Sequence, residues 1–172
     1  RIMDNVDIRN ALVYSPGAIR IMDQVKFESQ AISRNEIDIT GNAQVLYPGI
    51  LYATGNGSRN KPFGISISSD NQQYGSFLVV DDPFTSRIFP VERTLTVSQQ
   101  SRIAGFLYSD GYIRLEGTHI GSTFTGAFYY SQTQSSYVNW IKNGSIDRLS
   151  LTDAFMLPLG FASDPQPEIV SR

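Results

Sequence analysis

Apolar and polar side chains alternate along most of this chain with a period of two residues. Residues 63–68 read FGISIS and residues 112–116 read YIRLE, so large apolar side chains would face one side of the backbone and small or charged ones the other. This period is typical of half-buried β-strands. Similar runs recur roughly every 8 to 12 residues, and no segment shows the period of a long helix, so the chain is expected to be all-β.

The longest stretch of this kind covers residues 101–131, and it predicts three antiparallel strands joined by two tight turns. The first reversal is expected at residues 109–111, Ser-Asp-Gly, and the second at residues 121–122, Gly-Ser. Further hairpin turns are predicted at residues 41–42, Gly-Asn, and at residues 143–144, Asn-Gly. These residue types readily take the positive φ angles that tight hairpin turns require.

Together these elements predict a single jelly-roll or Greek-key β-sandwich (a β-barrel) with little helix, because that architecture holds many short strands and hides most of their edges. The predicted sandwich covers residues 18–161. Residues 1–17 are expected to form an N-terminal arm or a short helix capped by Asp4, and residues 162–172 a C-terminal arm. No internal repeat is visible, so a propeller or a solenoid is not expected.

The charge balance argues against a nucleic-acid partner. Only 17% of the 172 residues are charged, the formal net charge is -2, and lysine and arginine form no cluster. An electrostatic site for nucleic acid is therefore not expected. The polarity of the surface must come from Ser, Thr, Asn, Gln and Tyr, which suits broad contacts with neighbouring proteins.

Metal and membrane chemistry are limited by composition. The chain has no cysteine and one histidine, which excludes disulfides and thiolate sites and leaves no basis for a histidine-based zinc site. No cofactor is expected. No window approaches the roughly 20 apolar residues of a membrane-spanning helix, and no signal peptide is visible, so a soluble domain without a transmembrane segment is expected.

His119 is the only imidazole that could serve a catalytic triad. It stands beside the turn predicted at residues 121–122 without a nucleophile motif, so we interpret it as a solvent-facing turn residue. Glu92 and Glu116 are the acids that could form a glycosidase pair, but Glu116 lies on a strand face that is expected to point outward. A hydrolase is therefore the third of three functional hypotheses, and no catalytic residue is assigned.

Asp81 and Asp82, with Asp70 and Asn71 upstream, offer oxygen ligands for calcium. Their spacing matches no EF-hand loop. We interpret them as turn residues whose side chains accept backbone N–H bonds, and no metal site is assigned.

Aromatic residues gather in the second half of the chain and are its most informative feature. Core packing and cross-strand pairing are one interpretation of this set. The other is a contact face, either a subunit interface, where Tyr and Trp are enriched, or a platform on which sugars stack. The predicted contact face consists of Tyr108, Tyr112, Tyr129, Tyr130, Tyr137 and Trp140.

The whole chain resembles a known family of structural proteins. The features that carry the resemblance are the opening RIMDNVDIRNALVYSPG, the series of strands between Ala18 and Phe161, the absence of cysteine and a length typical of one barrel. On these features the chain is similar to the small major capsid protein, a single jelly roll, of icosahedral, tailless, internal-membrane-containing bacteriophages of thermophilic bacteria.

This resemblance implies a structural capsid subunit of a virion, without enzymatic activity. Copies would form homodimers or larger capsomers, would tile the shell together with a second, larger capsid protein, and would contact an internal membrane at most peripherally. Direct contact with nucleic acid is not implied. The alternative function is a receptor- or carbohydrate-binding β-sandwich, such as a spike head or a lectin-like module, which the tyrosines and polar loops favour.

Overall fold

The structure, a computed structural model, describes residues 5–55, 63–80, 93–132 and 135–150. Within these ranges the chain forms strands and no helix, and the strands build a nearly closed, barrel-like sheet. The all-β class and the sandwich-like or barrel-like architecture predicted from the sequence are thereby confirmed. The strands are β1 (Asp7–Ser15), β2 (Ile19–Ile21), β3 (Lys26–Ser33), β4 (Glu36–Gly41), β5 (Gln44–Val45), β6 (Ile50–Thr54), β7 (Phe63–Ser69), β8 (Gln72–Val80), β9 (Arg93–Val97), β10 (Arg102–Leu115), β11 (Thr118–Gln132), β12 (Ser135–Val138) and β13 (Ser145–Asp147).

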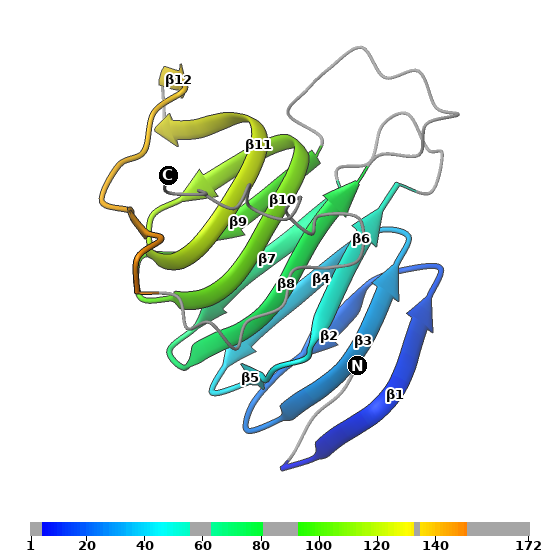
Figure 1. Cartoon of the computed structure of the whole chain (residues 1–172). Coiled ribbons are helices and arrows are strands. Elements are labelled where there is room, and N and C mark those ends of the chain that lie inside the picture. The colour runs from blue at the N-terminus through cyan, green and yellow to red at the C-terminus, as the bar shows by residue number, and fades with distance from the viewer. Residues whose placement is uncertain (1–4, 56–62, 81–92, 133–134, 151–172) are drawn as a thin grey trace, which may run out of the picture.

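Neighbouring strands run parallel almost throughout. Successive circuits of the chain stack on one another, so that β1, β3, β6, β8 and β10 lie side by side in one layer, while β2, β4, β7 and β9 form a second layer behind it (Figure 1). Among the described pairs, only β11 and β12 run antiparallel. Parallel stacking of this kind is the connectivity of a solenoid, whereas neighbours in a Greek key are antiparallel.

Strand β10 joins the two layers, and it passes through the first predicted reversal without reversing. Its first half pairs with β8 and its second half with β9, both parallel, and its register with β11 on the other side shifts between Ser109 and Tyr112. A Cβ atom on Gly111 would lie 2.4 Å from the carbonyl oxygen of Arg93. The glycine therefore permits a close approach of two backbones where the strand bends, and the hairpin predicted at residues 109–111 is wrong.

The other predicted hairpins are also wrong in direction. Gly121 lies inside β11 with a φ of +141°, and β11 runs parallel to β10. Gly41 ends β4 and leads to β5, which runs parallel to β3. Asn143 has the expected positive φ of 62°, but β13 beyond it pairs parallel with β11. Gly41 and Asn143 mark bends in a coil, because parallel neighbours are joined by a whole circuit and not by a two-residue turn, whereas Gly121 lies within an unbroken run of pairing with β10.

Two columns of aliphatic side chains fill the space between the layers. At each level, the pairing places a buried residue of one coil directly against the buried residue of the next, and each of these side chains is 3% exposed or less. The burial of this continuous apolar stack is the main stabilising contribution to the fold. The first column is Ile19, Ile37, Ile65, Leu95 and Ile113, and the second is Ile21, Ile39, Ile67, Val97 and Leu115.

The N-terminal segment belongs to the sheet. The short helix considered for residues 1–17 is wrong for residues 7–15, which form β1 and pair parallel with β3. Hydrogen bonding to β3 pairs one edge of this segment, and Ile8 and Val13 pack against the core, which an isolated one-turn helix could not achieve. The C-terminal arm predicted at residues 162–172 lies outside the described residues.

The coils differ in length, and this explains why a solenoid was not expected from the sequence. Paired residues Ile19 and Ile37 are 18 positions apart along the chain, whereas Ile65 and Leu95 are 30 positions apart. Sequence repeats reveal solenoids only where the period is nearly constant. The expectation that the chain is not a solenoid is therefore wrong.

Candidate interaction surfaces

Five of the six residues predicted as a contact face form ring contacts beyond the last complete coil, in two separate groups: Tyr112 with Tyr129, and Tyr130 with Tyr137 and Trp140. The antiparallel pairing of β11 with β12 sets Tyr130 opposite Tyr137, with ring centroids 6.3 Å apart. Tyr137 also contacts Trp140 at 5.6 Å, and Tyr129 contacts Tyr112 of β10 at 5.5 Å. We call these five residues the aromatic surface.

The aromatic surface is half-buried at Tyr112, Tyr129 and Tyr130 and exposed at Tyr137 and Trp140, because β11 extends past the paired part of the sheet. Alternate residues of its first half, such as His119 and Gly121, are buried, whereas no residue of the second half is. Trp140 is 54% exposed and Tyr137 is 41% exposed. Large aromatic rings with this exposure are enriched at binding surfaces, because their apolar bodies gain from being covered.

Two cations lie over the ring of Tyr130. The Nζ atom of Lys142 is 4.9 Å from the ring centroid, and the Cζ atom of Arg114 is 5.8 Å from it. Arg114 donates from Nε to the carboxylate of Glu116, which offsets its charge. The aromatic surface therefore carries a net positive charge that is centred on Lys142.

Polar groups border the same rings. The Tyr129 hydroxyl lies 3.0 Å from Oγ of Ser136, and this hydrogen bond lowers the pKa of the Tyr129 phenol. Gln132 donates from Nε2 to the hydroxyl of Tyr130 over 3.0 Å. These contacts hold the tyrosines in place while leaving donors and acceptors available at an exposed edge.

Tyr108 is the one predicted contact residue that the structure places elsewhere. It lies on the first half of β10, half-buried, where its parallel neighbours are Leu78 and Phe124. Conversely, sequence reasoning missed Arg114 and Lys142. The sequence offered one signal for them, because Arg114 stands two positions after Tyr112 and Lys142 two positions after Trp140. The position of the Tyr130 ring beside these cations, however, depends on the pairing of β11 with β12.

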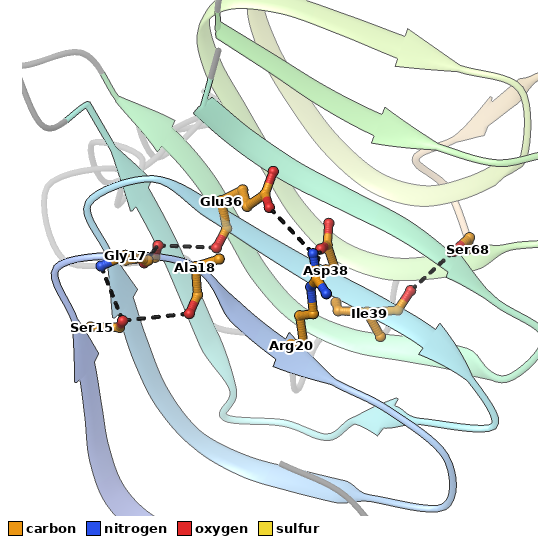
Figure 2. A network of polar contacts seen from close by, with 9 residues as sticks. Ser15, Gly17, Ala18, Arg20, Glu36, Asp38, Ile39 and Ser68 are labelled. Atoms are coloured by element: carbon orange, nitrogen blue, oxygen red, sulfur yellow. Dashed lines mark hydrogen bonds and ion pairs between the residues drawn. The ribbon is translucent and has the colours of Figure 1, made fainter. Parts of the chain in front are cut away.

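A second surface is a polar hollow on the outer face of β4, β7 and β9. Arg20 of β2 contacts Asp38 at 3.3 Å and Glu36 at 3.9 Å (Figure 2). Beside these carboxylates lies an open hollow of about 160 Å³. Gly64, which lines the hollow, lets the backbone of Thr94 approach closely, because a Cβ there would lie 1.9 Å from the Thr94 carbonyl oxygen. The hollow is lined by Glu36, Asp38, Phe63, Gly64, Ile65, Ser66, Thr94 and Thr96.

A third surface is the free edge of the first coil. The strand order begins with β1 and ends with β2, so each of these strands pairs on one side only among the described residues. On β1, Leu12 is 63% exposed and Tyr14 is 58% exposed. An edge of this kind presents unpaired backbone N–H and C=O groups together with apolar side chains.

His119 is buried in the core, so its interpretation as a solvent-facing turn residue is wrong. Its Nε2 donates to the carbonyl oxygen of Gly105, and its Nδ1 accepts from the hydroxyl of Thr123, 2.8 Å away. Burial lowers the pKa of His119 to about 4, although the hydrogen bond to Gly105 acts in the opposite direction. The parallel register puts His119 on an inward position next to Ile103, which the hairpin prediction could not anticipate.

The acids of the hydrolase hypothesis do not gather around this imidazole. Glu116 contacts Arg114, whose neighbours Ile113 and Leu115 point into the core, so this ion pair lies on the outer side of the layer. His119 points inward, and Glu92 lies outside the described residues. His119 and Glu116 therefore share no site.

The turn interpretation of Asp70 and Asn71 holds only in part: they lie at a bend between β7 and β8, but among the described residues no hydrogen bond has either side chain accepting from a backbone N–H. The backbone N–H of Asp70 donates to Gly41, and Asn71 donates from Nδ2 to the carbonyl oxygen of Asn42, so these residues connect neighbouring coils. Asp81 and Asp82 lie outside the described residues. In the described ranges, no three His, Asp or Glu side chains gather in a group that could hold a metal ion.

Comparison of this chain with protein-family models, with curated proteins and with solved structures finds no match. The resemblance to phage capsid proteins therefore stays a prediction. In the part of the chain that the structure describes, no helix has the length and apolar character needed to cross a bilayer.

Proposed function

We propose that this protein is a structural, non-catalytic subunit that assembles with further copies of itself through the open edge of its first coil. The observation that carries the proposal is the position of β1 and β2 at the two ends of the strand order, each with one unpaired edge. A solenoid is most stable when its terminal coils are covered. A neighbouring chain that pairs with this edge would continue the stack beyond Ile19 and Ile21, the last residues of the two aliphatic columns.

The most regular part of this edge is the second half of β1. The register of β1 shifts between Arg9 and Leu12, and Asn10 there has a positive φ of 50°, which interrupts the first half. From Leu12 to Ser15 the strand pairs with β3 without a break. Leu12 and Tyr14 are therefore the side chains that a neighbouring copy would cover.

Assembly into the capsomers of an icosahedral virion is the particular form of this function that the family resemblance predicts. A single jelly roll consists of antiparallel strands, so the parallel coils lend that particular form no support. We accordingly propose the assembling role in general, and the partners implied by the resemblance, a larger capsid protein and an internal membrane, stay predictions.

The test is sedimentation velocity over roughly a hundredfold range of protein concentration. The parent chain should shift from monomer to dimer or larger species as concentration rises, and Leu12→Lys should abolish the shift because a charge would be buried at the new contact. Leu149→Lys is the matched control, since Leu149 is 97% exposed and lies near the other end of the described chain. A parent chain that stays monomeric throughout the range would contradict the proposal.

Carbohydrate binding is a second candidate function, and the aromatic surface favours it. The rings of Tyr137 and Trp140 are exposed, and Gln132 and Ser136 form hydrogen bonds with the hydroxyls of the half-buried Tyr130 and Tyr129. This surface belongs to the last strands, whereas the proposed assembly edge belongs to the first coil. The two functions can therefore be tested by separate substitutions.

A further inference from the structure

We infer that the aromatic surface binds glycans that carry carboxylate groups, with the rings stacking on sugar faces and Lys142 pairing with a carboxylate. This inference rests on the second candidate function, carbohydrate binding, and adds the class of glycan. It is carried by the combination of exposed rings and an ammonium group held among them.

The rings supply a surface to which a sugar can adhere. Tyr130 and Tyr137 are stacked with an angle of 29° between their planes, and Trp140 continues the row at 44° to Tyr137. A pyranose ring has an apolar face of C–H bonds that packs on an aromatic face and a rim of hydroxyls that forms hydrogen bonds. An exposed aromatic row with a polar border complements both features.

Lys142 supplies the selectivity for an acid. Its ammonium group lies over Tyr130, and among the described residues no carboxylate approaches it within ion-pair distance. Arg114, the other cation at this ring, is already paired with Glu116. A ligand carboxylate would therefore find one ammonium group with free hydrogen-bond donors, fixed beside the stacking surface.

The same charge arrangement disfavours a nucleic acid as the ligand. A single-stranded nucleic acid also stacks on aromatic rings, but it carries one negative charge per nucleotide and needs a row of cations. Here one of the two cations is neutralised by Glu116, and the whole chain has a formal net charge of -2. An acidic glycan has more widely spaced charges, because neutral hydroxyls and rings separate its carboxylates.

The chain provides its own reporter for the test. Trp140 is the only tryptophan in the sequence and belongs to the aromatic surface, so its fluorescence responds to binding there. The probe is tetragalacturonate, and the matched neutral probe is its fully methyl-esterified form, which has the same rings without the charges. We expect a saturable fluorescence change with the acid, and affinity for the ester lower by about fivefold, as the loss of one exposed ion pair predicts.

Three variants separate the contributions. Lys142→Gln should weaken binding of the acid about fivefold and leave the ester unchanged. Tyr137→Ala should weaken both probes about tenfold, because it removes a ring from the stacking surface. Tyr74→Ala, at an exposed tyrosine of β8 that belongs to neither the aromatic surface nor the proposed assembly edge, should change neither.

The outcomes distinguish two claims: that the aromatic surface binds carbohydrate, and that it prefers glycans with carboxylate groups. Equal affinity for the acid and the ester would overturn the preference for carboxylates and leave carbohydrate binding in place. If the protein binds neither tetragalacturonate, nor its ester, nor a hyaluronan tetrasaccharide, both the preference for carboxylates and carbohydrate binding itself are overturned. Tighter binding of an oligothymidylate than of either acid would assign the surface to nucleic acid. If Tyr137→Ala fails to fold, the affinities of the parent chain for the acid and the ester still show whether the surface prefers carboxylates.

Discussion

His119 donates a hydrogen bond from Nε2 to the carbonyl oxygen of Gly105, 3.1 Å away in the interior of the coil. A carbonyl oxygen only accepts, so Nε2 carries the proton, and Nδ1 is free to accept from the hydroxyl of Thr123. The imidazole is thus neutral and satisfied at both nitrogens. A second proton at Nδ1 would face the Thr123 hydroxyl and would place a charge in the core without an anionic partner.

This arrangement predicts that the protein loses stability in mild acid. The pKa of His119 is lowered from 6.5 to about 4 in the fold, so the unfolded chain binds a proton between these values while the folded chain does not. The free energy of unfolding should therefore fall as the pH drops through 6.5 and should level off near pH 4. Between pH 7 and pH 5 the contribution is about 2 kcal/mol.

Urea unfolding at the two pH values measures this loss, and His119→Gln is the control. The amide of glutamine is uncharged at both values, so the difference between pH 7 and pH 5 should shrink by about 2 kcal/mol in the variant. An unchanged difference would assign the acid sensitivity to other groups.

The approach of Gly121 to Gly105 predicts a strong effect of a single methyl group. Gly121 has a φ of +141°, and a Cβ there would lie 1.9 Å from the carbonyl oxygen of Gly105. Gly121→Ala should therefore lower the free energy of unfolding by about 2 kcal/mol or more, because both the backbone angle and the contact become strained. Gly17→Ala is the control, since its nearest neighbour would be Oγ of Ser15 at 3.9 Å. Urea unfolding should show a change of no more than about 0.5 kcal/mol for the control.

Gln73 offers a test of buried hydrogen bonding. It is fully buried, its Oε1 accepts from the backbone N–H of Val45 at 2.7 Å, and its Nε2 donates to the carbonyl oxygens of Ala43 and Asn71. Gln73→Leu would remove the partner of the Val45 N–H and of the Asn71 carbonyl oxygen, whereas the Ala43 carbonyl oxygen would keep its hydrogen bond from the Ser69 hydroxyl.

The expected loss of stability for Gln73→Leu is about 2 to 4 kcal/mol, measured as a shift of the thermal midpoint and confirmed by urea unfolding. Gln72→Leu is the matched control on the same strand. The Gln72 side chain is only half-buried, and its backbone carbonyl, which accepts from Gln44, is not removed by the substitution. Equal losses of stability for the two variants would show that the hydrogen bonds of Gln73 do not contribute to the stability of the fold.

The period of two residues predicted which side chains point inward, but it could not predict the direction of the neighbouring strands. Ile65 and Ile67 are buried and Ser66 and Ser68 are not, as the alternation indicates. The direction depends on what joins the strands, and Gly121 was interpreted as a turn although its conformation serves contact with a parallel neighbour. Antiparallel and parallel arrangements can share the same alternation.

The aromatic surface was predicted in part for a similar reason. The residue types tyrosine and tryptophan alone suggested a contact face, and five of the six predicted residues form ring contacts, in two groups. The position of Lys142 over Tyr130 depends on the pairing of β11 with β12, and the position of Tyr108 depends on the register of β10 with β8. Such contacts between distant segments are not contained in local patterns.

The aliphatic columns predict a gradient of stability along the coil axis. Ile65 is 1% exposed and is paired in the middle of its column with Ile37 on one side and Leu95 on the other. Ile19 is 3% exposed, but it ends the column, with Ile37 as its only neighbour there among the described strands. A cavity between two coils cannot collapse as easily as one beside an open edge.

We therefore expect Ile65→Ala to lower the free energy of unfolding by about 3 to 4 kcal/mol and Ile19→Ala by only about 2 kcal/mol, because Ile19 loses fewer packing contacts. Ser66→Ala, on the outer side of β7, should change it by less than about 0.5 kcal/mol. Urea unfolding at low protein concentration measures all three. If the first coil is covered by a neighbouring copy, the cost of Ile19→Ala should rise toward that of Ile65→Ala as protein concentration increases, whereas a cost independent of concentration would contradict assembly through this edge.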